Sequence, residues 1–427
     1  MRRVPRWLLV ASGVAVFCLF AGLLIANFVG GETKIERRIK RLYTLDDPRF
    51  TRELGVLLGP AFVPGTQVEA LLNGDEIFPP MLSAIRAAQT SITFETYIYW
   101  SGDIGRTFAN ALAERARQGV KVHVLLDWVG SAKMDDHLVE TLEQAGVLVK
   151  RFHPPHWSNL GRMNNRTHRK LLVVDGQVGF TGGVGVAPHW MGRAQNPGHW
   201  RDTHFRVTGP VVAQMQAVFI DNWIKVTGDV LHGPNYFPVL APAGPSMAQM
   251  FSSSPSGGSE SMQLMYLLAI TAASRSIDLS AAYFVPDELT LQALMEAIQR
   301  GVRLRIVVPG EHIDSETVRQ ASRATWGPLL AAGAVIAEYK PTMYHCKVMI
   351  VDGLLVSVGS TNFDNRSFRL NDEATLNVVD AGFAQVQTAT FEADLALSHR
   401  VTHAAWLARP WRERLGETLA SLLNTQL

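Results

Sequence analysis

The sequence predicts an α/β protein made of two similar halves, related by an approximate two-fold axis and preceded by one transmembrane helix. Three observations lead to this prediction: an uncharged apolar run near the N-terminus, a regular alternation of helical and strand-like segments, and the return of that alternation in the second half. The chain has 427 residues, 47% of them hydrophobic, which fits a folded protein with more than one domain.

The apolar run extends from Trp7 to Val29 and contains no charged residue. At about 1.5 Å per residue, a helix of this length crosses a hydrocarbon core about 30 Å thick. A cleaved signal peptide is the alternative, but its apolar region is usually shorter and a small-residue cleavage site follows it. We therefore expect an uncleaved single-pass anchor. More basic residues follow the run than precede it, which favours a cytoplasmic catalytic body: Arg2, Arg3 and Arg6 before it, and Lys34, Arg37, Arg38, Lys40 and Arg41 after it.

Helix, glycine or polar turn, and apolar strand follow one another repeatedly after the anchor. Apolar residues at helical spacing lead into short runs rich in Val, Ile and Leu, as in α/β units with a mixed or mostly parallel sheet. The first half shows this series at residues 83–100, 111–130 and 142–152, and the second half shows it at residues 268–285, 293–310 and 329–340.

The segment from Phe237 to Met262 is rich in Pro, Ser and Gly and predicts the crossing between the two halves. We therefore expect an N-terminal anchor and juxtamembrane segment over residues 1–50, a first α/β domain over residues 51–240, and a second over residues 241–427.

One chemical pattern, His-x-Lys-x4-Asp, occurs once in each half and at the same place in the repeated series. In an extended strand the histidine and the lysine point to one face, because side chains alternate. A glycine turn follows each copy at the same offset. One match would need further context, but two matches at equivalent positions of a repeat indicate a shared site. The two sets are His168, Lys170 and Asp175, and His345, Lys347 and Asp352.

These paired motifs resemble those of the phospholipase D superfamily, over about residues 65 to 400. The continuation GSTNFDNRSFRLNDEATL from Gly359, together with WRDTH from Trp200, is most similar to the bacterial cardiolipin synthase branch. The resemblance implies two phospholipase D-like α/β domains with the six motif residues as the catalytic set. Within it, Asp175 and Asp352 would support the motif strands and loops.

The resemblance also implies how such a site works. One histidine attacks phosphorus and forms a phospho-histidine, and the other protonates the leaving alkoxide and later deprotonates the incoming hydroxyl. The family pattern favours His168 as the nucleophile and His345 as the acid and base, and the two roles could be exchanged. Lys170 and Lys347 would hold the non-bridging phosphoryl oxygens. Asn362 would add a phosphate-binding donor.

A catalytic imidazole also needs a partner that fixes its tautomer. Members of the family use a carboxylate downstream of each motif, and the pairing crosses between the halves. By that pattern Asp202 would orient His345, and Glu373 would orient His168. The alternatives are an ion pair between Asp202 and its neighbour Arg201, and an exposed loop position for Glu373.

The first copy departs from the family pattern at one position. Family copies usually have Asn three residues after the first glycine of the turn, and the second copy has it as Asn362. The first copy has Gly185 instead, so a donor to the phosphate is missing on that side. We expect that Gly185→Asn keeps or raises activity.

The function that follows is a phosphatidyltransferase of the bacterial cell membrane, which converts two phosphatidylglycerol molecules to cardiolipin and glycerol. The chemistry requires no metal or organic cofactor. A hydrolytic phospholipase D, with water as the acceptor, is the alternative. The formal charge of +2 and the anchor argue against nucleic acid as a partner. Two intact motifs argue against a membrane scaffold that has kept the fold without enzymatic activity. The sequence does not indicate an oligomeric state.

Several other residues have a structural and a functional interpretation. The histidines outside the motifs lack a zinc-binding spacing. The tryptophans are more typical of packing than of an acyl-chain entrance. The C-terminal segment from Ala404 predicts a helix that packs on its own domain, with contact to the bilayer as the alternative. The histidines considered as metal ligands are His153, His156, His189, His199 and His204, and the tryptophans considered for an acyl-chain entrance are Trp100, Trp157, Trp190 and Trp200.

Overall fold

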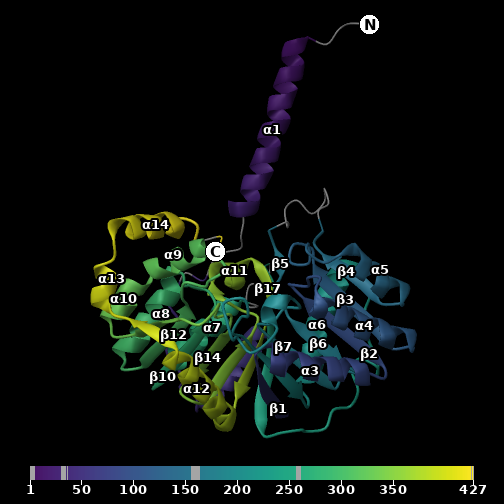
Figure 1. Ribbon diagram of the computed structural model, residues 1–427. Helices are drawn as coiled ribbons and strands as arrows, with labels where there is room; N and C mark the ends of the chain where they lie inside the picture. The colour runs from purple at the N-terminus through teal and green to yellow at the C-terminus, as the bar shows by residue number, and fades with distance from the viewer. Residues whose placement is uncertain are drawn as a thin grey trace.

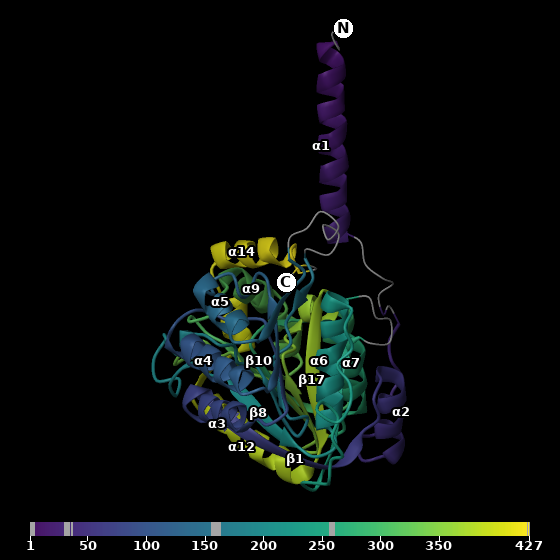
Figure 2. The same cartoon turned by 90° about the vertical axis from the view of Figure 1, so that its right-hand side faces the viewer.

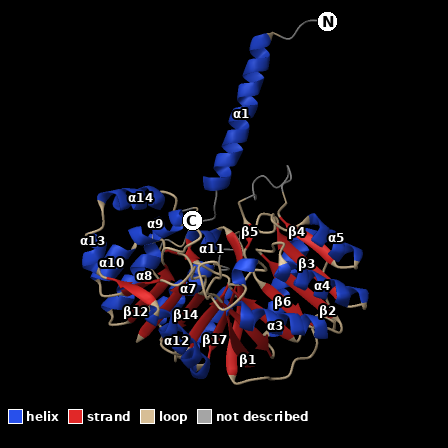
Figure 3. Cartoon of the chain, viewed as in Figure 1, coloured by secondary structure: helices blue, strands red, loops and turns tan. Residues whose placement is uncertain are grey.

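The computed structural model describes residues 5–29, 35, 37–154, 164–255, 261–424 and 426. Helices surround a wide, twisted β-sheet that runs through both halves of the chain (Figure 3). The first half supplies seven strands, in the spatial order β1 (Val63–Leu72), β8 (Thr203–Thr208), β7 (Val178–Gly182), β6 (Leu171–Val174), β2 (Ser91–Thr96), β3 (Lys121–Asp127) and β4 (Leu148–Phe152).

The second half repeats this order outward from the same central line. Its strands are β9 (Ser246–Ser253), β17 (Asn371–Val379), β15 (Leu355–Gly359), β14 (Lys347–Val351), β10 (Ser276–Ala281), β12 (Arg303–Pro309) and β13 (Val335–Tyr339), with β18 (Ser398–Val401) added at the edge. Strands β2, β3 and β4 are parallel, as are β10, β12 and β13, and the remaining pairs of the path are antiparallel. The predicted mixed α/β fold is confirmed.

The two halves meet where β9 pairs with β1, and this junction differs from the linker that the sequence predicts. The Pro-, Ser- and Gly-rich segment does cross between the halves, but its centre forms β9, which pairs with both β1 and β17. Alternate residues such as Ala248 and Met250 are fully buried. The polar residues between them hid the strand from the sequence pattern.

Helices cover both faces of the sheet, so the inner strands are buried on both sides and have continuous apolar runs. In the first half α3 (Asn73–Ala87), α4 (Asp103–Arg117) and α5 (Asp136–Gln144) pack in one core, while α6 (Val212–Thr227) covers the other face. In the second half the helices are α7 (Met262–Ala272), α8 (Glu288–Gln299), α9 (Glu316–Ala324), α10 (Trp326–Ala331) and α12 (Ala381–Ala396).

Besides the hydrophobic core of each half, a further core cluster extends across the junction between the halves. It joins residues of β8 and α6 to residues of β17 and α12, and the rings of Phe205 and Phe383 lie 6.0 Å apart within it. Helix α2 (Pro48–Leu58) also crosses the expected domain boundary, because its Phe50, Leu54 and Leu58 pack with α7 in the core of the second half. The two halves therefore share cores as well as a sheet.

Helix α1 (Arg6–Val29) extends away from the α/β body (Figure 2), and its described apolar side chains are mostly exposed. Within the described part of the chain, no helix combines the length and the apolar character that crossing a bilayer requires. The structure therefore does not show the predicted transmembrane span. Arg2, Arg3 and Lys34 of the charge argument lie outside the described residues.

The C-terminal segment forms α13 (His403–Leu407) and α14 (Trp411–Ser421). Helix α14 packs on α9, and Glu417 on its inner side accepts hydrogen bonds from Arg409. Its outer side exposes Trp411, Leu415 and Leu419. The helix lies at the end of the body from which α1 extends (Figure 1). The expected packing on its own domain is confirmed.

Candidate active site

The two motifs begin at the line between the halves, and each is fixed by a backbone hydrogen bond to the opposite half. The backbone N–H of His168 donates to the carbonyl oxygen of Asp372 at 2.9 Å, next to the short parallel pairing of β5 (Arg166–Thr167) with β17. The backbone N–H of His345 donates to the carbonyl oxygen of Arg201 at 2.7 Å. These two crossings bring the side chains of both motifs to one place.

Each histidine contacts a carboxylate of the opposite half through its Nδ1. The carboxylate oxygens of Glu373 lie 2.9 and 3.0 Å from Nδ1 of His168. An oxygen of Asp202 lies 2.7 Å from Nδ1 of His345. An anionic oxygen at Nδ1 accepts the proton there, so Nε2 is the nitrogen available for reaction in each ring. Nζ of Lys347 lies 3.2 Å from Nε2 of His345.

The structure differs from the alternative interpretations of both carboxylates. Arg201 forms a buried, two-pronged ion pair with Asp394, at 2.9 and 3.0 Å, and not with its neighbour Asp202. Glu373 is fully buried in β17 and does not lie in an exposed loop.

Groups to which the sequence analysis gave no such role hold these carboxylates. Trp190 donates its indole N–H to Asp202 at 2.9 Å, and the backbone N–H of Thr203 donates to it at 2.8 Å. Ser360 donates its hydroxyl to Glu373, and Asn371 donates its amide N–H at 3.2 Å. Only Ser360 had a sequence signal, since it follows the glycine of the turn.

The two lysines lie beside the histidines in the same arrangement in each half. Each Nζ donates to the carbonyl oxygen of its own motif histidine at 2.8 Å, so the two ammonium groups face one buried space. Burial and the like charge of Lys347 lower the pKa of Lys170 to about 7. Burial also lowers the pKa of Lys347, with Asp202 opposing the shift. Such a site favours an anion between the lysines.

The electrostatic surroundings of the two histidines differ. Burial, followed by the charges of Lys170 and Lys347, lowers the pKa of His168 well below its ordinary value. Burial and Lys347 also lower the pKa of His345, but Asp202 opposes them through charge and a hydrogen bond. Burial raises the pKa of Glu373 to about 7. Burial also acts to raise the pKa of Asp202, but contacts with His345, Lys347 and Trp190 outweigh this effect, so the pKa of Asp202 is lowered.

The motif aspartates do not lie with the histidines. Asp175 follows the far end of β6, and its carboxylate accepts the backbone N–H groups of residues 89–91 at 2.7 to 3.1 Å. Asp352 accepts those of residues 274–276 at 2.7 to 2.9 Å in the same way. Both residues have positive φ angles, 54° and 55°. They tie the turn after each motif strand to the start of the neighbouring strand, as expected for residues that support the motif strands and loops.

Asn362 and Gly185 occupy equivalent positions after the two glycine turns, with different surroundings. Asn362 is buried, and its Oδ1 has no hydrogen-bond partner among the described residues. A Cβ at Gly185 would lie 2.7 Å from Cβ of Ile98 and 3.1 Å from the ring of Trp190. The expectation that Gly185→Asn is harmless is therefore not supported, because this position has no room for a side chain.

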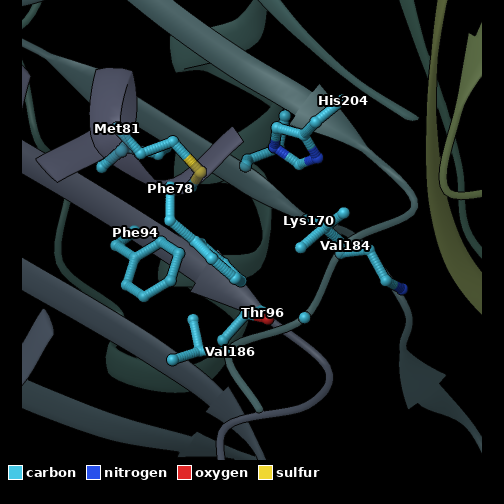
Figure 4. A pocket seen from close by; sticks show the side chains of 11 residues that line it. Phe78, Met81, Phe94, Thr96, Lys170, Val184, Val186 and His204 are labelled. Atoms are coloured by element: carbon cyan, nitrogen blue, oxygen red, sulfur yellow. The ribbon is translucent and has the colours of Figure 1, made fainter. Parts of the chain in front are cut away.

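A small cavity lies behind the site in the first half (Figure 4), and its volume is about 10 Å³. Lys170 and His204 line one side of it, and Phe78, Phe94 and Met81 line the other. Nδ1 of His204 is buried there without a hydrogen-bond partner in the described structure, and burial lowers the pKa of this histidine to about 3. The cavity has about the volume that one water molecule needs.

The described residues contain no group of three His, Cys, Asp or Glu side chains that could hold a metal ion. His189 stacks on Trp200, with ring centroids 5.3 Å apart, and Trp200 in turn lies 5.3 Å from His345. Trp190 is buried beside His345. These aromatic residues pack around His345. His156 and Trp157 lie outside the described residues.

Two pseudo-symmetric α/β halves, with one histidine and one lysine from each at a shared buried site, define an enzyme of the two-histidine phosphodiester-transfer class. The chain belongs to the family described as cardiolipin synthase, PLD-like domain, which matches residues 81–196 and 266–395.

Curated relatives and solved structures agree with this assignment. The chain is 36% identical to a cardiolipin synthase of Geobacillus kaustophilus over 85% of its length and 72% of that protein. It is 34% identical to the major cardiolipin synthase ClsA of Bacillus subtilis, over 85% of this chain and 76% of that one. Its fold matches the crystal structure of a phosphatidylserine synthase of Haemophilus influenzae, with a TM-score of 0.69 and 13% identity, covering 88% of this chain and all of that chain.

Proposed function

We propose that this protein is a phosphatidyltransferase that makes cardiolipin and glycerol from two molecules of phosphatidylglycerol. The observation that carries the proposal is the pair of buried histidines, each held at Nδ1 by a carboxylate of the other half, with two lysines beside them. Relatives named cardiolipin synthase, at 34 to 36% identity over most of both chains, support the lipid substrate.

The reaction has two displacements at phosphorus. In the first, Nε2 of His168 attacks the phosphorus of one phosphatidylglycerol, and the bond to the glycerol oxygen breaks while His345 gives that oxygen a proton. In the second, the hydroxyl of another phosphatidylglycerol loses its proton to His345 as its oxygen attacks, and the bond between phosphorus and His168 breaks. Lys170 and Lys347 neutralise the phosphoryl oxygens in both steps.

The electrostatic asymmetry supports this division of roles. A nucleophilic imidazole must be neutral, and burial with two adjacent ammonium groups keeps His168 neutral. A general acid must carry a proton; burial and Lys347 lower the pKa of His345, but Asp202 opposes that lowering, so the charged form is disfavoured less for His345 than for His168. The phosphodiester anion, once bound, offsets the lysine charges and favours a charged His345 further.

The proposal extends to the membrane of a bacterial cell, where the substrates are found. The uncharged run Trp7–Val29 and the exposed apolar side chains of α1 support an N-terminal anchor. The outer side of α14, with exposed Trp411 and Leu415, lies at the same end of the body and fits contact with a bilayer surface. The distribution of basic residues around the run supports a cytoplasmic body.

The test is a product assay with the full chain in vesicles of phosphatidylglycerol. Equal amounts of cardiolipin and glycerol are expected. Phosphatidic acid with glycerol, and no cardiolipin, would instead identify a hydrolase that uses water as acceptor. No turnover of phosphatidylglycerol would exclude both lipid activities. His168→Ala and His345→Ala each serve as inactive controls for contaminating enzymes.

A further inference from the structure

Two arginines from opposite halves lie beside the His168 side of the site. Arg166 is in β5, two residues before His168, so in this extended segment its side chain points to the same face as His168. Arg366 is in the short helix α11 (Asn365–Arg369) of the second half. Its guanidinium donates to the carbonyl oxygen of Asn164 at 3.1 Å and to the Oδ1 of the same residue at 3.2 Å. The side chain of Arg366 therefore contacts a residue that precedes Arg166 by only two positions.

The charges of the two guanidinium groups act on the same neighbours. Burial lowers the pKa of Arg166; the charge of Asp127 opposes this shift, and the charge of Arg366 adds to it. Both arginines oppose the burial-driven rise in the pKa of Tyr97, whose ring contacts the imidazole of His168 at 5.2 Å between centroids. Arg366 also contributes to the lowered pKa of His168. The two cations therefore adjoin the nucleophile.

Neither arginine forms an ion pair with a carboxylate of the described residues within 4.0 Å. The buried Arg169 and Arg201 both have such partners. Arg166 lies over the ring of Trp128, at 5.3 Å, and the indole N–H of Trp128 is buried with no hydrogen-bond partner in the described structure. Half-burying two cations, and burying an indole N–H that has no acceptor, costs free energy unless an anion binds to these groups.

The pair breaks the approximate symmetry of the site. The spacing that relates His168 to His345 relates Arg166 to Met343 and relates Arg366 to His189. His189 is stacked on Trp200, meets the ring of Trp100 edge-on, and offers no guanidinium. The reacting phosphate would lie between two matched histidine–lysine sets. Among the described residues, this arginine pair lies on the His168 side and has no counterpart at the equivalent positions on the His345 side.

We propose that Arg166 and Arg366 bind the phosphodiester of the acceptor lipid. This inference rests on the proposed function, in which the attacking hydroxyl belongs to a glycerol that carries its own phosphodiester. One three-carbon glycerol separates that second phosphate from the phosphorus under attack. The planar guanidinium groups of two arginines can each donate two hydrogen bonds to the oxygens of this second phosphate. Water and free glycerol have no such group. The arginine pair therefore selects a lipid alcohol as acceptor.

The test compares two acceptors that use the same phosphatidyl-enzyme. One is phosphatidylglycerol, which gives cardiolipin. The other is radiolabelled glycerol, which exchanges into phosphatidylglycerol and brings no second phosphate. The variants are Arg166→Gln, Arg366→Gln and their combination, with the exposed Arg117→Gln as the matched control. Each single variant is expected to lower cardiolipin formation about tenfold or more, because a charge-assisted hydrogen bond is lost. Glycerol exchange should stay within about twofold of the parent enzyme.

The outcomes separate this inference from the proposed function. An equal fall in both reactions, in variants with the parent melting temperature, would show that the arginines serve the common chemistry and not the acceptor. Unchanged cardiolipin formation would also overturn the inference. A parent enzyme that exchanges glycerol but makes no cardiolipin would instead refute the proposed function. If a Gln variant unfolds, Arg166→Lys and Arg366→Lys replace it, with a smaller loss expected for the cardiolipin reaction alone.

Discussion

Glu373 belongs to the second half of the chain, yet both oxygens of its carboxylate lie within 3.0 Å of the Nδ1 of His168 in the first half. The reverse contact joins Asp202 to His345. Neither half therefore contains a complete histidine–carboxylate pair.

This crossing makes both carboxylates sensitive positions for activity. Glu373→Gln should lower kcat by about two to four orders of magnitude, because an amide at Nδ1 no longer fixes the tautomer. Asp202→Asn should have an effect in the same range. Steady-state kinetics on phosphatidylglycerol vesicles measure both. The exposed Glu143→Gln is the matched control. Nearly full activity in either site variant would mean that the contact has no role in orienting the imidazole.

The covalent intermediate should identify the nucleophile. In His345→Ala the first displacement can proceed slowly without an acid, but the acceptor is not deprotonated, so a phosphatidyl group should accumulate on His168. His168→Ala should accumulate none. Labelled phosphatidylglycerol, a quench at alkaline pH and peptide mass spectrometry detect the adduct. Label on residue 345 of His168→Ala, with none on residue 168 of the other variant, would exchange the two roles.

Gly185 should not accept the asparagine that its counterpart Asn362 has. The new Cβ would meet Ile98 at 2.7 Å and Trp190 at 3.1 Å, so Gly185→Asn should lower the free energy of unfolding by about 1–3 kcal/mol, and activity should fall with it. Thermal unfolding measures the effect. Gly185→Ala should show a smaller loss, and Ile98→Gly, which removes the clashing Cβ, should make the further loss caused by Gly185→Asn smaller than in the parent. A more stable and more active Gly185→Asn enzyme would contradict this account.

The buried Glu95 should make stability depend on pH. Its Oε1 accepts hydrogen bonds from Thr167 and Asn222, but its Oε2 is buried with no partner among the described residues. Burial raises the pKa of Glu95 from 4.5 to about 7. The folded state therefore prefers the protonated acid. The resulting stability is fully present below about pH 4.5 and is lost as the pH rises through about 7.

Replacement of this group by a neutral amide tests the argument. Glu95→Gln should gain stability relative to the parent as the pH rises from about 4.5 to 7, with a difference of up to about 3 kcal/mol above that range. Denaturant unfolding at several pH values measures the difference, and Glu143→Gln should show none. A pH-independent difference between Glu95→Gln and the parent would show that Glu95 does not titrate in this range.

The sequence was sufficient for the α/β class, the repeat and the paired motifs, because these depend on local periodicity and on spacing. It was not sufficient for β9, whose serines and glutamine resemble a linker and become a strand only between β1 and β17. The anchoring of Asp202 by Trp190 is a contact between loops that no local pattern encodes. The crowding at Gly185 depends on Ile98, a residue far away in the sequence.

The continuous sheet has a consequence for the order of events during turnover. Strand β9 pairs with β1, the Arg201–Asp394 ion pair bridges the halves, and one core extends across them. The halves therefore cannot separate and close around a lipid. In the proposed mechanism, glycerol would then leave and the acceptor would arrive one after the other, without an opening movement of the halves. The lifetime of the proposed covalent intermediate would depend on how soon an acceptor arrives, and therefore on the density of phosphatidylglycerol in the bilayer.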